Sequence, residues 1–184
     1  MTMKLKNLIH KLLYSNLLIL ILLTSSANAA QEDTSEPINV EADRMQYDSE
    51  NKISRFFGNV IATQGSIEIR SAQMEVRQDD SGNELGVAIG SKEKRAYFKQ
   101  DRDIENEYVE GEALRLEYDG RTSTLKLVGD AVVRRYKNNQ LWDQSTGGVI
   151  TYNDKTSFYT VESGANRAST TGRIKVVLTP EPKK

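Results

Sequence analysis

Residues 66–77 have the sequence SIEIRSAQMEVR, in which apolar and polar side chains alternate. Ile67 and Ile69 lie between polar residues, and Met74 and Val76 repeat the pattern. Successive side chains of a β-strand point to opposite faces, so this alternation is typical of a strand with one buried face. The stretch therefore predicts half-buried β-structure.

The same alternation returns at residues 114–118 and 125–127, and no stretch of comparable length has helical periodicity. Clusters rich in Asp, Asn, Gly and Ser separate the runs and predict turns. They lie at residues 48–51, 64–65, 79–83, 119–120, 137–139 and 153–154. With about ten residues for each strand and its turn, the chain would hold roughly fifteen short strands. The sequence predicts an all-β, antiparallel fold of stacked short hairpins.

Two landmarks recur at one spacing along the chain. Tyr47-Asp48 followed by Gly58-Asn59 returns 71 residues later as Tyr118-Asp119 followed by Gly129-Asp130. A repeat of this kind buries its apolar face by stacking on its neighbours. We therefore expect an elongated roll of hairpins with two open ends.

The strands at these ends are expected at residues 37–42 and 172–179. An edge strand offers unpaired backbone donors and acceptors to a partner, so strand addition between molecules is available. The alternative is an edge protected by Lys175, the one lysine within its apolar run. The apolar residues expected at the two edges are Ile38, Val40, Ile174, Val176 and Leu178.

Residues 1–29 have the pattern of a cleaved signal peptide. Three lysines precede a wholly apolar run at residues 17–23, and Ala27-Asn28-Ala29 supplies small residues for cleavage. The apolar stretch is short for a membrane span, and an uncleaved anchor is the alternative. The expected organisation is residues 1–29 signal peptide, 30–36 flexible mature N-terminus, 37–179 β-roll and 180–184 short tail.

Composition excludes several classes of protein. The 184 residues contain no cysteine and one histidine, His10, which lies in the expected signal. The mature chain therefore lacks thiol nucleophiles, cysteine-ligated metals and imidazole bases, and we expect no enzyme, no metal and no cofactor. Removing residues 1–29 leaves 22 basic and 26 acidic residues, a balance that argues against nucleic-acid binding. Export without cysteine suits a Gram-negative periplasm.

A series of short segments carries a more specific signal. They are EPINVEAD at residues 36–43, FGNVIATQG at 57–65, Ile67-Glu68-Ile69 with Ala72, RAYF at 95–98, Glu110-Gly111 with Ala113, and LVGDA at 127–131. In this order the segments resemble the lipopolysaccharide-transport periplasmic LptA family, also called OstA-like. The resemblance covers most of residues 36–165.

The resemblance implies a β-jelly-roll, V-shaped in section, whose interior groove receives the acyl chains of lipopolysaccharide. It also implies head-to-tail assembly through edge strands, without any hydrolysis by the protein itself. Its partners would be lipopolysaccharide, further copies of itself, the jelly-roll partner of an inner-membrane transport complex, and the periplasmic domain of the outer-membrane translocon. The alternatives are an inner-membrane-anchored partner of the same pathway and a secreted carbohydrate-binding or polysaccharide-modifying β-roll.

A path for acyl chains needs a continuous apolar stripe. By alternation and resemblance, the side chains expected to line it are Ile38, Val40, Ile67, Ile69, Met74, Val76, Phe98, Leu114, Leu116, Tyr118 and Leu127. Each of them also suits an ordinary core. Candidates to bind the headgroup phosphates are Arg70, Arg77, Lys92, Lys94, Arg95 and Lys99, for which a solvated outer face is the alternative.

Overall fold

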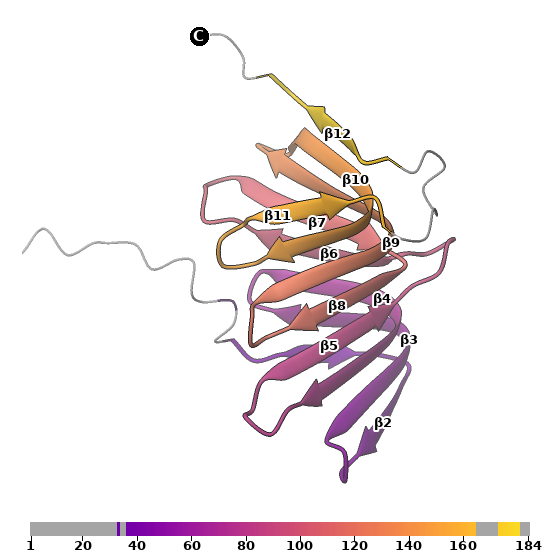
Figure 1. The fold of residues 1–184 in the computed structure, drawn as a ribbon. Helices are drawn as coiled ribbons and strands as arrows, with labels where there is room; N and C mark the ends of the chain where they lie inside the picture. The colour runs from indigo at the N-terminus through magenta and orange to yellow at the C-terminus, as the bar shows by residue number, and fades with distance from the viewer. Residues whose placement is uncertain (1–32, 34–35, 165–172, 181–184) are drawn as a thin grey trace, which may run out of the picture.

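The computed structural model describes residues 33, 36–164 and 173–180, which form a single antiparallel sheet of twelve strands (Figure 1). The expected signal peptide, residues 1–29, lies outside the described residues. The strands are β1 (Asn39–Glu41), β2 (Arg44–Asp48), β3 (Ile53–Gln64), β4 (Ile67–Gln78), β5 (Glu84–Ile89), β6 (Ala96–Asp101), β7 (Glu107–Ala113), β8 (Arg115–Asp119), β9 (Thr124–Lys137), β10 (Gln140–Asn153), β11 (Tyr159–Glu162) and β12 (Lys175–Leu178). Among these residues, no helix has the length and apolar character to cross a membrane.

The all-β, antiparallel prediction is confirmed, and the described residues form twelve strands where roughly fifteen were expected for the mature chain. The difference comes from β3, β4, β9 and β10, which are 12 to 14 residues long. Each of these long strands changes partner along its length. For example, β3 pairs with β2 through its N-terminal half and with β1 through its C-terminal half.

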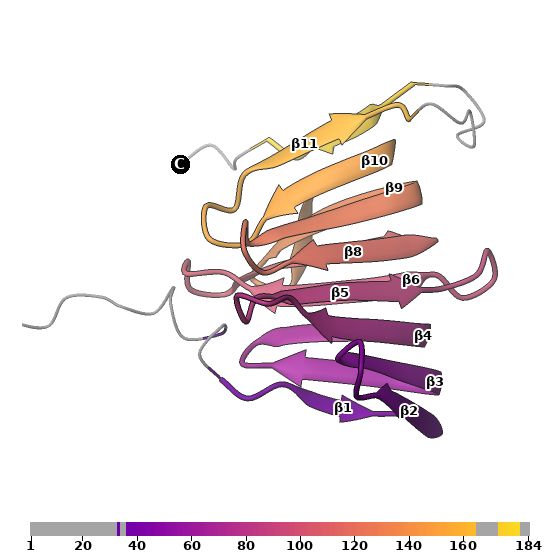
Figure 2. The same cartoon turned by 60° about the horizontal axis from the view of Figure 1, so that its bottom comes forward.

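This change of partner divides the sheet into two walls. The first wall contains β1, β6, β7 and β12, and the second contains β2, β5, β8 and β11. The long strands run through both walls and bend between them. Figure 2 shows the strands stacked along one axis, with β1 and β2 at one end and β11 at the other.

In β3 and β9 the bends occur at the repeated glycines. Gly58 and Asn59 have φ of 77° and 44°, and Gly129 and Asp130 have φ of 81° and 49°. This left-handed region suits glycine and is tolerated by Asn and Asp. The strand registers shift at both places, as in a β-bulge, which bends a strand.

The repeat is therefore structural as well as sequential. The carbonyl of Gly58 accepts a hydrogen bond from the backbone N–H of Asp43 (3.1 Å), and that of Gly129 accepts one from Leu114 (2.9 Å), again 71 residues apart. Strands β1 to β6 form a first unit and β7 to β12 a second unit. The units join where β5 pairs with β8 and β6 with β7.

The core lies between the two walls. Its fully buried side chains include Val60, Leu116, Leu127 and Ile150, which come from both units. Burial of apolar area contributes about 25 cal/mol per Å², so these contacts hold the walls together. At the N-terminal side, Asp33 accepts hydrogen bonds from the backbone N–H and the hydroxyl of Ser66, both at 2.6 Å.

Candidate functional site

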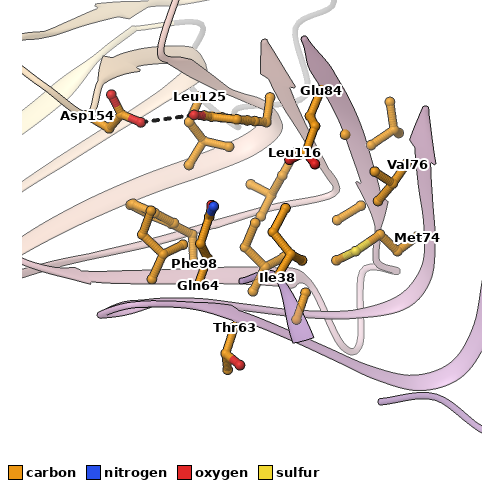
Figure 3. Close-up of a pocket in the computed structure, with 17 residues that line it drawn as sticks. Ile38, Thr63, Gln64, Met74, Val76, Glu84, Phe98, Leu116, Leu125 and Asp154 are labelled. Carbon is orange, nitrogen blue, oxygen red and sulfur yellow. Dashed lines mark hydrogen bonds between the residues drawn. The ribbon is translucent and has the colours of Figure 1, made fainter. Parts of the chain in front are cut away.

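A cavity lies between the two walls and is lined mainly by the first unit (Figure 3). Strands β3, β4 and β6 supply its first wall, and β4, β5 and β8 supply much of its second. Apolar alternation brings these side chains to the inside, because every second residue of each strand points inward. Eight of the side chains expected from the sequence line it: Ile38, Ile67, Ile69, Met74, Val76, Phe98, Leu116 and Tyr118.

The other three expected side chains lie elsewhere. Val40 packs against the core cluster, and Leu127 is fully buried within it. Leu114 lies at the bend, where a Cβ placed on Gly129 would meet its side chain at 3.0 Å. None of the three lines the cavity.

Sequence reasoning missed the small residues that leave the space open. Ala62, Gly86 and Ala88 line the cavity from β3 and β5. Their inward parity follows from alternation, as Ala62 lies two residues after Val60. Alanine and glycine contribute little to an apolar alternation, however, so the sequence of β5 gave no clear strand pattern. Leu125, whose inward position follows from the alternation at residues 125–127, also lines the cavity. The other lining residues that we did not list are Thr63, Gln64, Glu84, Val87 and Asp154.

The polar lining groups lie at strand ends away from the bends. Gln64 ends β3, Glu84 begins β5, and Asp154 directly follows β10. The hydroxyl of Tyr118 donates a hydrogen bond to Oδ2 of Asp154 (3.2 Å). Figure 3 draws this bond as the dashed line that ends at Asp154. Burial is the main cause that raises the pKa of the Asp154 carboxyl, and burial also raises the pKa of Tyr118. The cavity thus has an apolar interior and a polar rim.

The basic residues considered for phosphate binding lie outside this cavity. Arg70 forms an ion pair with Glu68 and lies over the ring of Tyr97, 5.5 Å from its centroid. Arg95 forms an ion pair with Glu112 (2.7 Å). The four others are Arg77, Lys92, Lys94 and Lys99. Among the described residues, no group of three or more His, Cys, Asp or Glu side chains could hold a metal ion.

The enclosed part of the cavity is small, and one side of it is open to solvent. Its volume is about 90 Å³, less than the volume of a cavity of about 150 Å³ that binds benzene. An acyl chain would therefore fit only in part within the enclosed volume, and the rest would extend through the open side or need the walls to move apart.

Comparison with known proteins decides the family. A sequence model of the family described as "LptA/(LptD N-terminal domain) LPS transport protein" matches residues 39–158, more than half of the chain. The chain belongs to this family. The matched segment runs from β1 to the turn before β11, so it contains both glycine bends and every residue that lines the cavity except Ile38.

Curated relatives in the LptA family agree. The lipopolysaccharide export system protein LptA of Haemophilus influenzae is 32% identical over 149 residues, which cover 79% of this chain and 80% of that protein. The LptA protein of Escherichia coli strain K12 is 33% identical over 122 residues, which cover 65% of this chain and 64% of that protein. The match therefore spans less than two thirds of the E. coli protein.

A solved structure supports the fold. The crystal structure of LptH from Pseudomonas aeruginosa is described as that of the LptA-homologous periplasmic component of a lipopolysaccharide transport device. It matches with a TM-score of 0.70 and 23% identity, over 81% of this chain and 99% of that chain. This comparison confirms that the all-β roll is the fold of an LptA-like protein.

Proposed function

We propose that this protein binds lipopolysaccharide in the periplasm and carries it from the inner membrane to the outer membrane. The observation that supports this proposal is the apolar cavity between the walls of an LptA-family fold. The protein would act by binding and shielding, without catalysing a reaction.

The lining explains how acyl chains would be held. Removing their apolar surface from water contributes about 25 cal/mol per Å². Acyl chains would lie against Ile69, Phe98 and Leu116 in the interior, and the polar headgroup would stay in water outside the rim. Because the enclosed volume is small, acyl chains would also extend through the open side of the cavity.

Direction of transport must come from partners. Successive sites along an apolar groove would bind the lipid with similar affinity. Without a difference in affinity between these sites, the groove alone cannot drive net movement of lipid in one direction. The sequence also contains no Gly-rich phosphate loop for a nucleotide. An inner-membrane complex that fills the first molecule and an outer-membrane translocon that empties the last would supply the direction.

Head-to-tail assembly is the second part of the proposal. Within the described residues, β1 and β2 pair only with β3, and β11 and β12 pair only with β10. Met45 in the edge strand β2 is 53% exposed, whereas its repeat equivalent Leu116 is 1% exposed because β5 and the first unit cover it. A second copy would cover Met45 and Tyr47 in the same way.

Site-specific photo-crosslinking tests the lipid site. The photo-reactive residue replaces Ile38, which lines the cavity and is 39% exposed, or Glu117, which points to the outer face of β8 as a matched control. With purified lipopolysaccharide, we expect capture at residue 38 and none at residue 117. Equal capture at both positions, or capture at residue 117 alone, would show that the cavity is not the lipid site.

We also propose that residues 1–29 are removed on export. Mass spectrometry of the native protein should find the N-terminus close to residue 30. An intact Met1 would instead favour an inner-membrane-anchored relative of the same pathway.

A further inference from the structure

Side chains of β10 and β11 bridge the space between the two walls, and one of them reaches β6 at the edge of the first unit. Tyr152 of β10 is 3% exposed, and its hydroxyl donates a hydrogen bond to Oε1 of Gln100 in β6 (3.3 Å). Its ring lies against Phe98, with 5.8 Å between ring centroids. The hydroxyls of Ser145 and Tyr159, on opposite walls, share a second hydrogen bond of 3.1 Å.

Strand registers identify the first-unit residue that corresponds to each of these groups. Tyr152 pairs with Leu125, and the residue 71 positions before Leu125 is Ser54, which pairs with Val76. Tyr152 therefore occupies the position of Val76. By the same comparison, the partner of Tyr152 in β11 is Tyr159, and the partner of Val76 in β5 is Gly86.

The two units thus differ where the cavity is formed. In the first unit Val76 and Gly86 line open space, and in the second unit two tyrosines fill it. The opposite wall changes as well, since Asp143 and Ser145 correspond to Ile67 and Ile69. Asp143 is buried and forms an ion pair with Arg135 at 2.5 Å. An interior with these polar groups is a poor path for an acyl chain.

We infer that Tyr152 and Tyr159 close the second unit and set the limit of the lipid-binding groove within one molecule. This inference rests on the proposed function. Lipid bound to one copy would end at Phe98 and Leu116. Transfer toward β11 and β12 would then require the walls of the second unit to part and both tyrosine hydrogen bonds to break.

The test replaces the second-unit residues by their first-unit equivalents. The variant Tyr152→Val/Tyr159→Gly is made with a photo-reactive residue at Val161, which packs inside the second unit. In the otherwise unchanged chain we expect lipopolysaccharide to be captured from residue 38 and not from residue 161. In the double variant, we expect capture from residue 161 to appear.

Tyr152→Phe is the matched control, because it loses the hydrogen bond to Gln100 but keeps the ring that fills the space. We expect no capture from residue 161 in this variant. Capture at residue 161 in the unchanged chain, or no gain in the double variant when circular dichroism shows that it is folded, would overturn the inference.

A second measurement does not depend on lipopolysaccharide. Titration with N-phenylnaphthylamine, an apolar fluorescent dye, should show additional bound dye in the double variant relative to the unchanged chain and to Tyr152→Phe. Equal dye binding in all three folded proteins contradicts the inference. If only the capture of lipopolysaccharide at residue 38 fails, the proposed function is refuted, whereas the dye titration still tests whether the two tyrosines close the second unit.

Discussion

The contact between Tyr118 and Asp154 places a carboxyl group at the polar rim of an apolar cavity. Burial raises the pKa of Asp154 above 3.8, the value for a solvent-exposed aspartate, so folding favours its protonated form. The penalty for ionising this group is absent below pH 3.8 and grows as the pH rises through the raised pKa. Above that pKa the folded protein bears the full penalty.

Asp154→Asn should therefore change how stability depends on pH. The amide oxygen can still accept the hydrogen bond from Tyr118, but it does not ionise. We expect the free energy of unfolding of the variant, relative to the unchanged chain, to rise as the pH increases from 3 to 7. Urea denaturation of both proteins at a series of pH values measures this difference. A difference that is constant with pH would contradict the expectation.

Residues that line the cavity should also differ in how they affect stability. Phe98 is buried among residues of both walls, so Phe98→Ala should lower the free energy of unfolding by about 3–5 kcal/mol. Ile38 is 39% exposed, and Ile38→Ala should lower it by less than about 1 kcal/mol. Urea denaturation measures both values.

A lipid-binding measurement should show whether Ile38 contributes to ligand binding even though it contributes little to stability. With a photo-reactive residue at Tyr118, Ile38→Ala should reduce capture of lipopolysaccharide while the protein stays folded. Unchanged capture would mean that Ile38 does not contribute to the groove.

At the scale of strands, the bends at the repeated glycines form the two walls. Gly129 has φ of 81°, and a Cβ there would meet the Leu114 side chain at 3.0 to 3.3 Å. Gly82, in the turn between β4 and β5, has φ of 86° and no atom within 4 Å of the corresponding position. Alanine substitutions at Gly82 and at Gly129 therefore separate the cost of backbone strain from the cost of side-chain crowding at the bend.

Gly82→Ala should cost about 1–2 kcal/mol, because an L-residue in this left-handed region is strained. Gly129→Ala should cost more, because the same strain is joined by contact with Leu114. The free energies of unfolding in urea measure the difference. Equal costs would show that the bend accommodates a side chain without resistance.

The same bends limited what could be predicted from sequence. Alternation identified the inward faces of residues 66–77 and 114–118 because it depends only on the local chain. It did not show that β3 continues through Gly58-Asn59, since a glycine with an asparagine also suits a turn. Likewise, alternation assigned Leu127 an inward position but not the filling of the space around it. That filling depends on side chains from other strands, which pack with Leu127 in the core cluster.

At the scale of the whole molecule, the junction between the units offers a template for pairing between chains. The strands β6 and β12 are equivalent, as are β7 and β1, because they pair with equivalent positions of the long strands. Phe98 pairs with Gly111 in the chain, so the equivalent pair between chains is Val176 with Val40. The neighbouring pair within the chain is Tyr97 with Glu112, and the equivalent pair between chains is Lys175 with Glu41.

The second pair of edges gives the same result. Pairing of β5 with β8 predicts that β11 of one copy meets β2 of the next. Ala88 pairs with Leu116 within the chain, so the equivalent pair between chains is Val161 with Met45. The adjacent pair within the chain is Ile89 with Arg115, and its equivalent between chains is Glu162 with Arg44. Both junctions therefore place opposite charges together, and such cross-strand pairs contribute roughly 0.2–1 kcal/mol each.

This register predicts which cysteines can link two copies. The natural chain has no cysteine, so Val40→Cys/Val176→Cys should form a ladder of disulfide-linked oligomers under mild oxidation, visible on a non-reducing gel. Val40→Cys/Val177→Cys is the control, because a slip of one residue moves a side chain to the other face of the strand. We expect few linked oligomers from it, since cysteines whose Cβ atoms point apart cannot form a disulfide without backbone movement. Ladders of equal yield from both variants would contradict the register, and dilution should abolish any ladder that depends on assembly of copies in solution.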